Sequence, residues 1–502
     1  MKKYIRIVFA LTFSLLINLS TATAEDVEIN IYSINDFHGA LRERSDAPGI
    51  ALLSGALKDA QAASRNNILV AAGDLFGTTV DAKDTNGMST VLAFNELGIS
   101  CIALGNHEFD YDRSILNKQS KAAGFGFLAG NIRSADGRQP FKGYSIIEKD
   151  GVKIAFIGMI TADTAQTATR KNIQDLEFIN PQEILPQYID LARAKGADIV
   201  VLLSHIGSQQ LSGGLITDEI TEALSADVRN LDAAISAHTH KAVNGKYKDI
   251  PVVQAKCYGQ MIAHLKINYS KAHKKVLAIN HKLLDVRAQR SFIPDTQMSI
   301  FIQPYLQAAD AKYNTVIATN RQELRNNRFE PSSLANCFAD MMQAATGADL
   351  VLLNAGAIRK DYLDTGDFTL RNLIDIFPFE NYLIVAQISG ADIIKALEYG
   401  IQHPRYGMLR FAGLQVTYNT SKPQGQRVEK VTLQDGSALQ SNKHYKIASI
   451  DFLLDGGDGF TMLKSAHSRE QLGILSDALA EYIKTANNIL HKDDGRLSII
   501  QE

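Results

Sequence analysis

The stretch Cys101-Ile-Ala-Leu-Gly-Asn-His-Glu-Phe-Asp110 shows the pattern that decides the fold. Its first four residues are apolar, as in a buried strand, and they open directly into polar residues that can bind a metal. The same arrangement recurs along the N-terminal half. Residues 27–34 lead to Asp36 and His38, residues 68–72 to Asp74, residues 199–204 to His205, and residues 233–237 to His238 and His240. Amphipathic helical stretches separate these runs up to about residue 293, which predicts an α/β fold.

Seven metal-capable side chains stand at these strand ends. Ligands of α/β sheets bind beyond the carboxyl ends of strands, so we expect the seven to gather at one edge. Residues two apart in a strand point the same way, which predicts that each Asp-x-His or His-x-His pair shares one face. A mixed oxygen and nitrogen set of this size suits two ions that share a bridging carboxylate better than one tetrahedral ion. The alternative is that these are satisfied polar groups at strand ends. The candidate ligands are Asp36, His38, Asp74, Asn106, His205, His238 and His240.

In these motifs and their order, the chain resembles the metallophosphoesterase superfamily. Over nearly all of its mature length it resembles the periplasmic and surface 5′-nucleotidase branch. The resemblance implies an N-terminal αββα sandwich that holds two divalent ions, which are Zn, Mn, Co or Mg. It assigns Asp36, His38, Asp74 and His240 to one ion, and bridging Asp74, Asn106, His205 and His238 to the other.

His107 and Asp110 form a separate pair. His107 directly follows the candidate ligand Asn106 and cannot easily point at the same ion, whereas Asp110 stands one turn later and can accept its ring proton. The family resemblance makes this pair the catalytic dyad, in which His107 stabilises the transition state or protonates the leaving oxygen. Related cyclic-nucleotide phosphodiesterases often carry Asn in place of this aspartate, so Asp110 favours a 5′-nucleotidase. The alternative is a surface ion pair after a loop.

The rest of the chain predicts a connector and a second unit. Residues 294–314 have a helical pattern that we expect to be interrupted at Pro304. The expected divisions are a signal peptide at residues 1–24, a catalytic domain at 25–293, the connecting helix at 294–314, and a C-terminal α/β nucleotide-binding domain at 315–502. In this last domain we expect strands at residues 349–353, 381–388 and 445–450, the last of these being the final strand.

The C-terminal unit carries candidate substrate-binding residues. Phe379 and Phe452 match the positions that stack on the base in the family, although core packing is the usual role of such a side chain. Asp458 matches a ribose-binding residue, and Arg359 matches an arginine that faces the substrate. Ala357 stands where the family usually has glycine, which puts the substrate fit in doubt. The full set is Asn354, Gly356, Arg359, Phe379, Phe452, Asp458, Arg325 and Arg328, the last two being equally compatible with a solvated basic face.

Composition limits the partners. The 52 Lys and Arg residues nearly balance the 54 Asp and Glu residues. The chain has no excess of basic residues that would favour binding to long nucleic acid or to an anionic membrane surface. A small nucleotide is therefore the expected partner, bound by a few placed cations or metals.

The first residues predict secretion. Lys2, Lys3 and Arg6 precede an apolar run at residues 7–19, and a small-residue cleavage site ends at Ala24. We expect cleavage there, no stable membrane anchor, and a periplasmic or, alternatively, extracellular location. A retained anchor is the alternative, but the run is short for a span. The three scattered cysteines allow one disulfide, with at least one buried free thiol.

The leading function is hydrolysis of nucleoside 5′-phosphates, with possible cleavage of di- and triphosphates or UDP-sugars. One alternative is a 2′,3′-cyclic-nucleotide 2′-phosphodiesterase with 3′-nucleotidase activity. Another is a catalytically silent surface protein that binds nucleotides. Retention of the complete ligand set and of His107 weighs against the silent protein, since binding alone has no need for them.

Overall fold

A computed structural model describes residues 26–77, 79–288, 292–489, 491 and 495–500. The signal peptide expected at residues 1–24 lies outside the described residues. Within them, no helix combines the length and the apolar character needed to cross a membrane.

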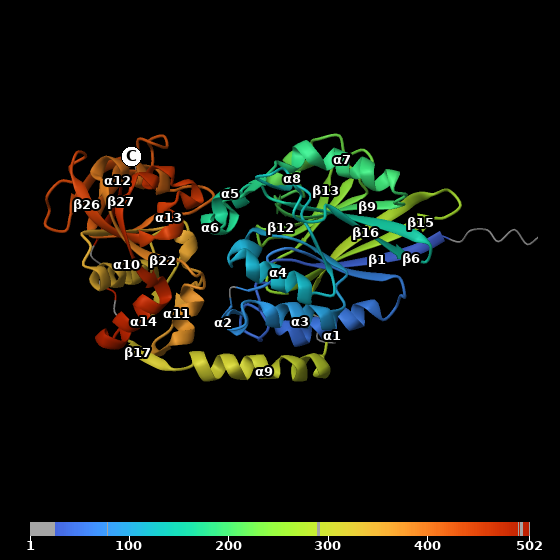
Figure 1. Cartoon of the computed structure of the whole chain (residues 1–502), viewed down its shortest axis with the longest axis horizontal. Coiled ribbons are helices and arrows are strands. Elements are labelled where there is room, and N and C mark those ends of the chain that lie inside the picture. Colours follow the sequence, from blue (N-terminus) through green and yellow to red (C-terminus); the bar gives the residue numbers. More distant parts are fainter. Residues whose placement is uncertain (1–25, 78, 289–291, 490, 492–494, 501–502) are drawn as a thin grey trace, which may run out of the picture.

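The N-terminal half contains two six-stranded sheets (Figure 1). In the first, β1, β2, β3 and β4 are parallel. The strand β15 pairs antiparallel with β1, and β16 pairs antiparallel with β15. In the second, β7, β9, β12 and β14 are parallel, with β6 and β13 antiparallel at the edges. In spatial order the first sheet is β16 (Lys275–Asp285), β15 (Met261–Ser270), β1 (Asp26–Ile34), β2 (Asn67–Ala72), β3 (Cys101–Ala103) and β4 (Gly126–Leu128), and the second is β13 (Ala242–Tyr247), β14 (Ile250–Ala255), β12 (Ala233–Ala237), β9 (Ile199–Gly207), β7 (Val152–Ile160) and β6 (Tyr144–Lys149).

The two sheets pack face to face, with helices on both outer sides. Ile31, Val70 and Cys101 of the first sheet share one buried cluster with Phe156 and Val201 of the second. On the outer face of the first sheet lie α1 (Gly49–Gln61), α3 (Met88–Leu97) and α4 (Arg113–Ala122), and on that of the second lie α7 (Pro181–Ala194) and α8 (Glu219–Ala223). Strands buried on both sides read as nearly continuous apolar runs. The expected αββα sandwich is confirmed.

The connecting helix α9 (Thr296–Tyr313) is continuous, so the expected interruption at Pro304 is wrong. Met298, Ile302 and Leu306 bury one face of α9 against the helices of the first sheet. Pro304 removes a hydrogen bond to the carbonyl of residue 300. Both Pro304 and Ile300 are exposed, so water can hydrate that carbonyl while the buried face holds the helix together.

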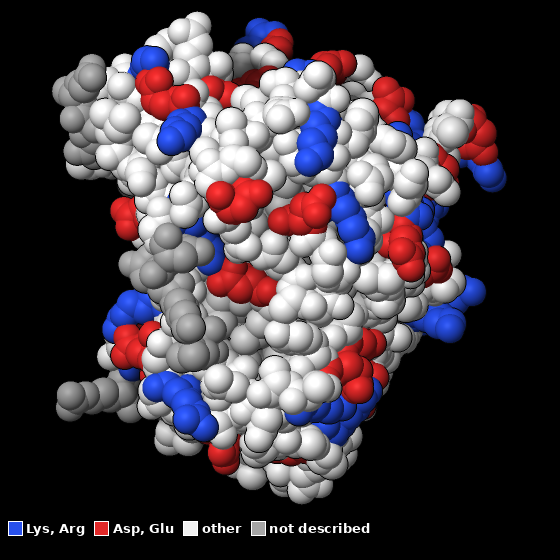
Figure 2. Space-filling model, turned by 90° about the vertical axis from the view of Figure 1, so that its left-hand side faces the viewer, with Lys and Arg blue, Asp and Glu red and all other residues white. Residues whose placement is uncertain are grey.

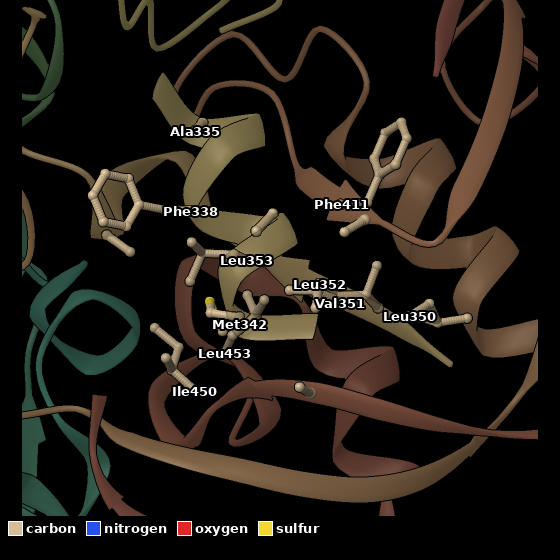
Figure 3. Packing of buried hydrophobic residues seen from close by; sticks show 14 of the residues in the cluster. Ala335, Phe338, Met342, Leu350, Val351, Leu352, Leu353, Phe411, Ile450 and Leu453 are labelled. Carbon is tan, nitrogen blue, oxygen red and sulfur yellow. The ribbon is translucent and has the colours of Figure 1, made fainter. Parts of the chain in front are cut away.

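The C-terminal unit is built on a five-stranded sheet, in the order β23 (Arg410–Ala412), β19 (Leu350–Leu353), β26 (His444–Ile450), β22 (Tyr382–Ser389) and β27 (His467–Ile474). The helix α10 (Ser333–Thr346) packs Phe338 and Met342 over Leu353 of β19 (Figure 3). Helices α12 (Gly390–Gly400) and α14 (Leu475–Ala486) complete this core. A smaller sheet has the order β25 (Val428–Leu433), β24 (Leu414–Asn419) and β28 (Leu497–Ile500).

Residues 445–450 are therefore not the final strand, because β27 and β28 follow. The apolar pattern of the sequence does not predict β27, because β27 is an exposed edge strand whose residues are mostly polar. The shorter elements are β5 (Ile132–Ser134), β8 (Leu176–Phe178), β10 (Gln209–Gln210), β11 (Ile216–Thr217), β17 (Val316–Asn320), β18 (Leu324–Arg325), β20 (Tyr362–Leu363), β21 (Gly366–Thr369), α2 (Val80–Lys83), α5 (Thr164–Thr167), α6 (Arg170–Ile173), α11 (Leu370–Ile376), α13 (Asp451–Leu454), and the 3₁₀ turns η1 (Asn106–Phe109), η2 (Ala355–Ala357), η3 (Gly457–Gly459) and η4 (Thr461–Ser465).

The surface of the C-terminal unit carries both signs of charge. On the face in Figure 2, Lys and Arg side chains are interspersed with Asp and Glu side chains. All three cysteines, Cys101, Cys257 and Cys337, are buried, and none of them forms a disulfide bond with another described residue. The optional disulfide of the sequence analysis is thus absent among the described residues.

Candidate active site

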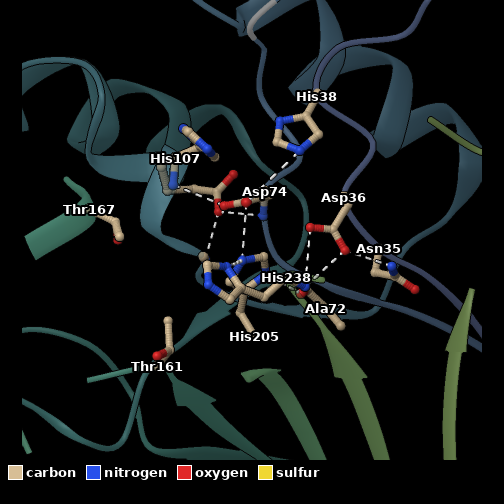
Figure 4. A network of polar contacts seen from close by, with 12 residues as sticks. Asn35, Asp36, His38, Ala72, Asp74, His107, Thr161, Thr167, His205 and His238 are labelled. Carbon is tan, nitrogen blue, oxygen red and sulfur yellow. Dashed lines mark hydrogen bonds and ion pairs between the residues drawn. The ribbon is translucent and has the colours of Figure 1, made fainter. Parts of the chain in front are cut away.

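The ends of β1, β2, β9 and β12 bring six of the candidate metal ligands into two groups. Asp36, His38 and His240 form one group, and Asp74, His205 and His238 form the other, with ligand atoms within 4.8 Å of one another in each. Asp74 lies between the groups, with Oδ2 3.0 Å from Nε2 of His205 and 3.9 Å from Nε2 of His38 (Figure 4). This is the position of a bridging carboxylate. The seventh candidate, Asn106, begins η1 and is buried.

The backbone at these ligands is left-handed. The φ angles of Asp36, His38, Asp74, His238 and His240 lie between 49° and 76°. Residues other than glycine rarely adopt this region, at a cost of roughly 1–3 kcal/mol each. The expectation that Asp36 and His38 share a strand face is wrong, since β1 ends at Ile34 and both residues lie on the loop beyond it. It is wrong for His238 and His240 as well, since β12 ends at Ala237 and the two histidines belong to different ligand groups. Such strain persists where the surroundings hold it, and it is common at functional sites.

Several atoms in the site fit a cation. Nδ1 of His205 lies 2.9 Å from the carbonyl oxygen of Ala72, so Nδ1 carries the proton and donates it. Nε2 of His205 lies 3.0 Å from Oδ2 of Asp74. Burial opposes protonation of this imidazole, but the charge of Asp74 raises the pKa of His205 to about 10, so a proton occupies this contact until a cation takes its place. Nδ1 of His38 and Oδ1 of Asn106 are buried without a hydrogen-bond partner among the described residues. A divalent ion would bind Nε2 of His205 and Oδ1 of Asn106, whereas Nδ1 of His38 points away from the ligand groups because Nε2 of the same ring faces Asp74. The donor set suits Zn, Mn or Co.

The strand β9 extends further than the sequence suggested. His205 lies inside β9, which runs to Gly207, rather than after its end. Its ring still reaches the site because the backbone oxygen of Ala72 in the facing sheet holds Nδ1. Gly73 allows this approach, since a Cβ there would lie 2.7 Å from Nδ1 of His205.

The structure places His107 and Asp110 in direct contact. Nδ1 of His107 lies 2.7 Å from Oδ2 of Asp110, and the backbone N–H of His107 donates to Oδ1 of Asp74 at 2.9 Å. Burial alone would lower the pKa of His107, but the charges of Asp110 and Asp74 raise it above its ordinary value. The imidazole is thus held in one orientation beside the candidate metal groups, with Nε2 left for a substrate.

Phe379 and Arg359 of the C-terminal unit lie next to His107. The ring of Phe379 stacks on that of His107, with centroids 5.4 Å apart and planes within 8°. The guanidinium of Arg359 lies 5.4 Å from the centroid of Phe379. Phe452 is partly buried, packs against the C-terminal core, and covers Gly457 so closely that a Cβ there would lie 2.5 Å from its ring. The two phenylalanines are thus held by different neighbours, and their role as a base clamp stays a prediction.

Asn354, Gly356, Asp458 and Arg328 lie together. Nδ2 of Asn354 donates to Oδ2 of Asp458 at 2.7 Å, while Oδ1 of Asn354 is buried without a partner among the described residues. Burial raises the pKa of Asp458. A Cβ on Gly356 would lie 3.2 Å from Nδ2 of Asn354 and 3.7 Å from Nη2 of Arg328. Burial, and next the charge of Arg359, lower the pKa of Arg328.

The structure separates residues that the sequence analysis left equivalent. Arg325 is exposed and pairs with Glu323, away from this cluster, whereas Arg328 lies within it. Ala357, which replaces the family glycine, is 2% exposed in the C-terminal core and does not have a left-handed φ. Its methyl group therefore fills core space without forcing the loop into a new shape.

Polar contacts across the boundary between the two halves were missed from sequence. Arg405 pairs with Asp163 at 2.8 Å and with Glu219 at 2.7 Å, and the hydroxyl of Tyr406 donates to Asp163. Beyond the site, Arg371 of α11 pairs with Asp81 of α2 at 2.9 Å. Figure 1 shows α5 and α2 toward opposite ends of this boundary. No local motif marks these residues, because each partner lies far away in sequence.

Comparison with known proteins agrees with this geometry. A family model described as calcineurin-like phosphoesterase matches residues 29–242, and another, described as 5′-nucleotidase, C-terminal domain, matches residues 309–465. The chain belongs to the 5′-nucleotidase family. As a member of this family it combines a metallophosphoesterase N-terminal domain with a 5′-nucleotidase C-terminal domain, and its two ligand groups are consistent with a binuclear phosphoesterase.

Three of the proteins that the chain is similar to share about a quarter of its residues. The chain is 26% identical to protein UshA of Yersinia enterocolitica, over 91% of each chain. It is also 26% identical to endonuclease YhcR of Bacillus subtilis, over 96% of this chain but only 42% of the length of that endonuclease. The fold resembles that of a 5′-nucleotidase precursor from Thermus thermophilus, with a TM-score of 0.81, 24% identity, and coverage of 95% of this chain and 100% of the other.

Proposed function

We propose that this phosphoesterase hydrolyses nucleoside 5′-monophosphates to a nucleoside and phosphate. The observation that carries the proposal is the stacking of Phe379 on His107. The contact supports the proposal because Phe379, the aromatic side chain of the C-terminal unit that we propose stacks on the base, lies directly beside a candidate catalytic imidazole. Nucleoside di- and triphosphates and UDP-sugars are proposed as further substrates.

In this proposal the N-terminal unit supplies the metal ligands and the catalytic pair. Asp36, His38, Asp74 and His240 would hold one divalent ion, and Asp74, Asn106, His205 and His238 the other. When bound, such a pair activates water and stabilises the charge of the phosphoryl group. Asp110 fixes the ring of His107, whose Nε2 donates a hydrogen bond to the phosphoryl or leaving oxygen.

The C-terminal unit would hold the rest of the nucleotide. Arg359 and Arg328 supply positive charge for phosphate oxygens. The carboxylate of Asp458, oriented by Asn354, accepts hydrogen bonds from ribose hydroxyls. Phe379 and Phe452 offer aromatic faces to the base. Secretion across the inner membrane into the periplasm is part of the proposal and is supported by the pattern of residues 1–24.

The test is separation of the nucleoside and nucleotide products, together with phosphate release, from AMP, ADP, ATP, UDP-glucose, 3′-AMP and 2′,3′-cyclic AMP, each with Mn²⁺, Zn²⁺, Co²⁺ and Mg²⁺. We expect AMP to be cleaved with the highest kcat/KM. Preferential cleavage of 2′,3′-cyclic AMP and 3′-AMP would replace the proposal with a cyclic phosphodiesterase. Nucleotide binding without hydrolysis under any metal would indicate a silent binding protein.

A further inference from the structure

The Glu108 carboxylate joins two ligand-bearing loops. Glu108 is 2% exposed and lies within η1, two residues after Asn106. Its Oε2 accepts the backbone N–H of Asp74 at 2.8 Å and that of Gly105 at 2.7 Å. Its Oε1 accepts the backbone N–H of Leu75 at 2.7 Å and makes a longer contact with that of Phe76 at 3.4 Å. One buried side chain thus satisfies N–H groups of the loop after β2 and of the loop after β3.

The connection is reciprocal. While Glu108 of the second loop binds the backbone at Asp74, the side chain of Asp74 accepts the backbone N–H of His107 through Oδ1 at 2.9 Å. Each loop therefore uses a carboxylate to hold the backbone of the other. Asp74 keeps only Oδ2 directed at His205 and His38 as a result.

The two loops pack so closely that there is no room for a side chain at Gly105. A Cβ on Gly105 would lie 2.2 Å from Oδ1 of Asp74. Asp74 also has a φ of 55°, which its own sequence does not favour. An external restraint is needed to keep this backbone, and the bonds from the N–H groups of Asp74 and Leu75 to Glu108 supply it.

We propose that Glu108 is a positioning residue that sets the place of the bridging Asp74 relative to Asn106 and His107. It would act on both metal affinity and turnover without touching either ion or substrate. The inference rests on the two-metal part of the proposed function and is independent of which phosphate ester is cleaved. Groups that orient metal ligands in this way typically change metal affinity by about 10–100-fold when removed.

The experiment compares two Glu→Gln variants of the full chain. Glu108→Gln keeps the shape of the side chain, but its amide nitrogen must face an N–H group on one side, which cannot accept a hydrogen bond. Glu398→Gln is the matched control. Glu398 also binds two backbone N–H groups, those of Arg427 and Val428, each at 2.8 Å, but within the C-terminal unit.

Binding of Mn²⁺ to the metal-free chains is measured by calorimetry, and kcat and KM are measured with p-nitrophenyl phosphate. We expect Glu108→Gln to weaken at least one Mn²⁺ site by about 10–100-fold. Its kcat should fall with little change in KM, and excess Mn²⁺ should restore part of the lost rate. Glu398→Gln should bind Mn²⁺ as the wild type does, even if its thermal midpoint falls as far.

Equal Mn²⁺ affinity in wild type and Glu108→Gln would overturn the inference, as would equal losses in the two variants. If Glu108→Gln does not fold, Glu108→Asp replaces it, since the shorter carboxylate cannot reach both loops. Wild-type affinity in that variant would refute the role, and a weakened site would support it. A wild-type chain that binds Mn²⁺ but spares AMP would refute the proposed substrate, while the Mn²⁺ comparison still decides the role of Glu108.

Discussion

The rings of His107 and Phe379 are stacked, 5.4 Å apart and within 8° of parallel, although they belong to different halves of the chain. His107 is fixed by Asp110 in the N-terminal unit, whereas Phe379 lies between α11 and β22 in the C-terminal unit. The contact therefore depends on how the two units are arranged. We expect substrate entry to change this arrangement, because the face of His107 is covered here.

Metal removal tests the ligand groups. Exhaustive chelation should abolish hydrolysis, and a divalent ion should restore it. Asp74→Asn should be the most damaging single ligand change, since Asp74 faces both groups and a neutral amide bridges two cations poorly. The measurement is phosphate release together with bound metal per chain. Activity that survives chelation, or an Asp74→Asn variant close to wild type, contradicts the two-metal interpretation.

His107→Ala should separate catalysis from metal binding. The side chain of His107 contacts Asp110, Phe379 and the edge of the His38 ring, but it belongs to neither ligand group, so its loss should leave metal content unchanged. Turnover should fall by about a hundredfold or more, as is usual for a lost acid or electrostatic group. Parallel assays of kcat and of metal content decide the point. Loss of metal in proportion to activity would instead make His107 part of the ligand set.

Phe452→Ala tests whether the ring of Phe452 stacks on the base of the nucleotide. The change should cost nucleotide hydrolysis about 1–3 kcal/mol, the usual contribution of base stacking, and should spare p-nitrophenyl phosphate, which has no base. The value of kcat/KM is compared for the two substrates. If both fall equally, the ring of Phe452 serves the C-terminal core, against which it already packs.

His264 should make stability depend on pH. Burial, and the charges of Lys282 and Lys266, lower the pKa of His264 to about 4, although Glu28 opposes them. The unfolded chain takes up this proton near pH 6.5 and the folded chain does not, so the free energy of unfolding should fall as the pH drops from about 6.5 toward 4. The slope contributed is at most about 1.4 kcal/mol per pH unit.

His264→Gln checks this directly. Nε2 of His264 lies 2.8 Å from Oδ1 of Asn30, and a glutamine amide can donate the same bond without taking up a proton. Thermal midpoints measured between pH 7 and pH 4.5 should decline less steeply in the variant. Parallel declines in the two proteins would remove His264 as a cause.

The family resemblance implied the sandwich. The sequence by itself indicated an α/β fold, the places along the chain of the strands that lead to the site, and the residue types that reach the shared edge. It did so because each of these features is local: an apolar run of strand length is followed at once by Asp, Asn or His. The same holds for the pairing of His107 with Asp110, which lie one turn apart. It could not distinguish Arg325 from Arg328, because burial and partners, not residue type, separate them.

The tertiary structure alone decided the features that need two distant segments. Glu108 reads as an ordinary charged residue until the loop after β2 places three backbone N–H groups beside it. Asp36 and His38 reach the site on left-handed backbone rather than on one strand face, at a local cost that only the surrounding contacts can offset. Phe379 meets His107 only when the two units come together, and such contacts leave no periodic or local trace in a sequence because their partners are far apart along the chain.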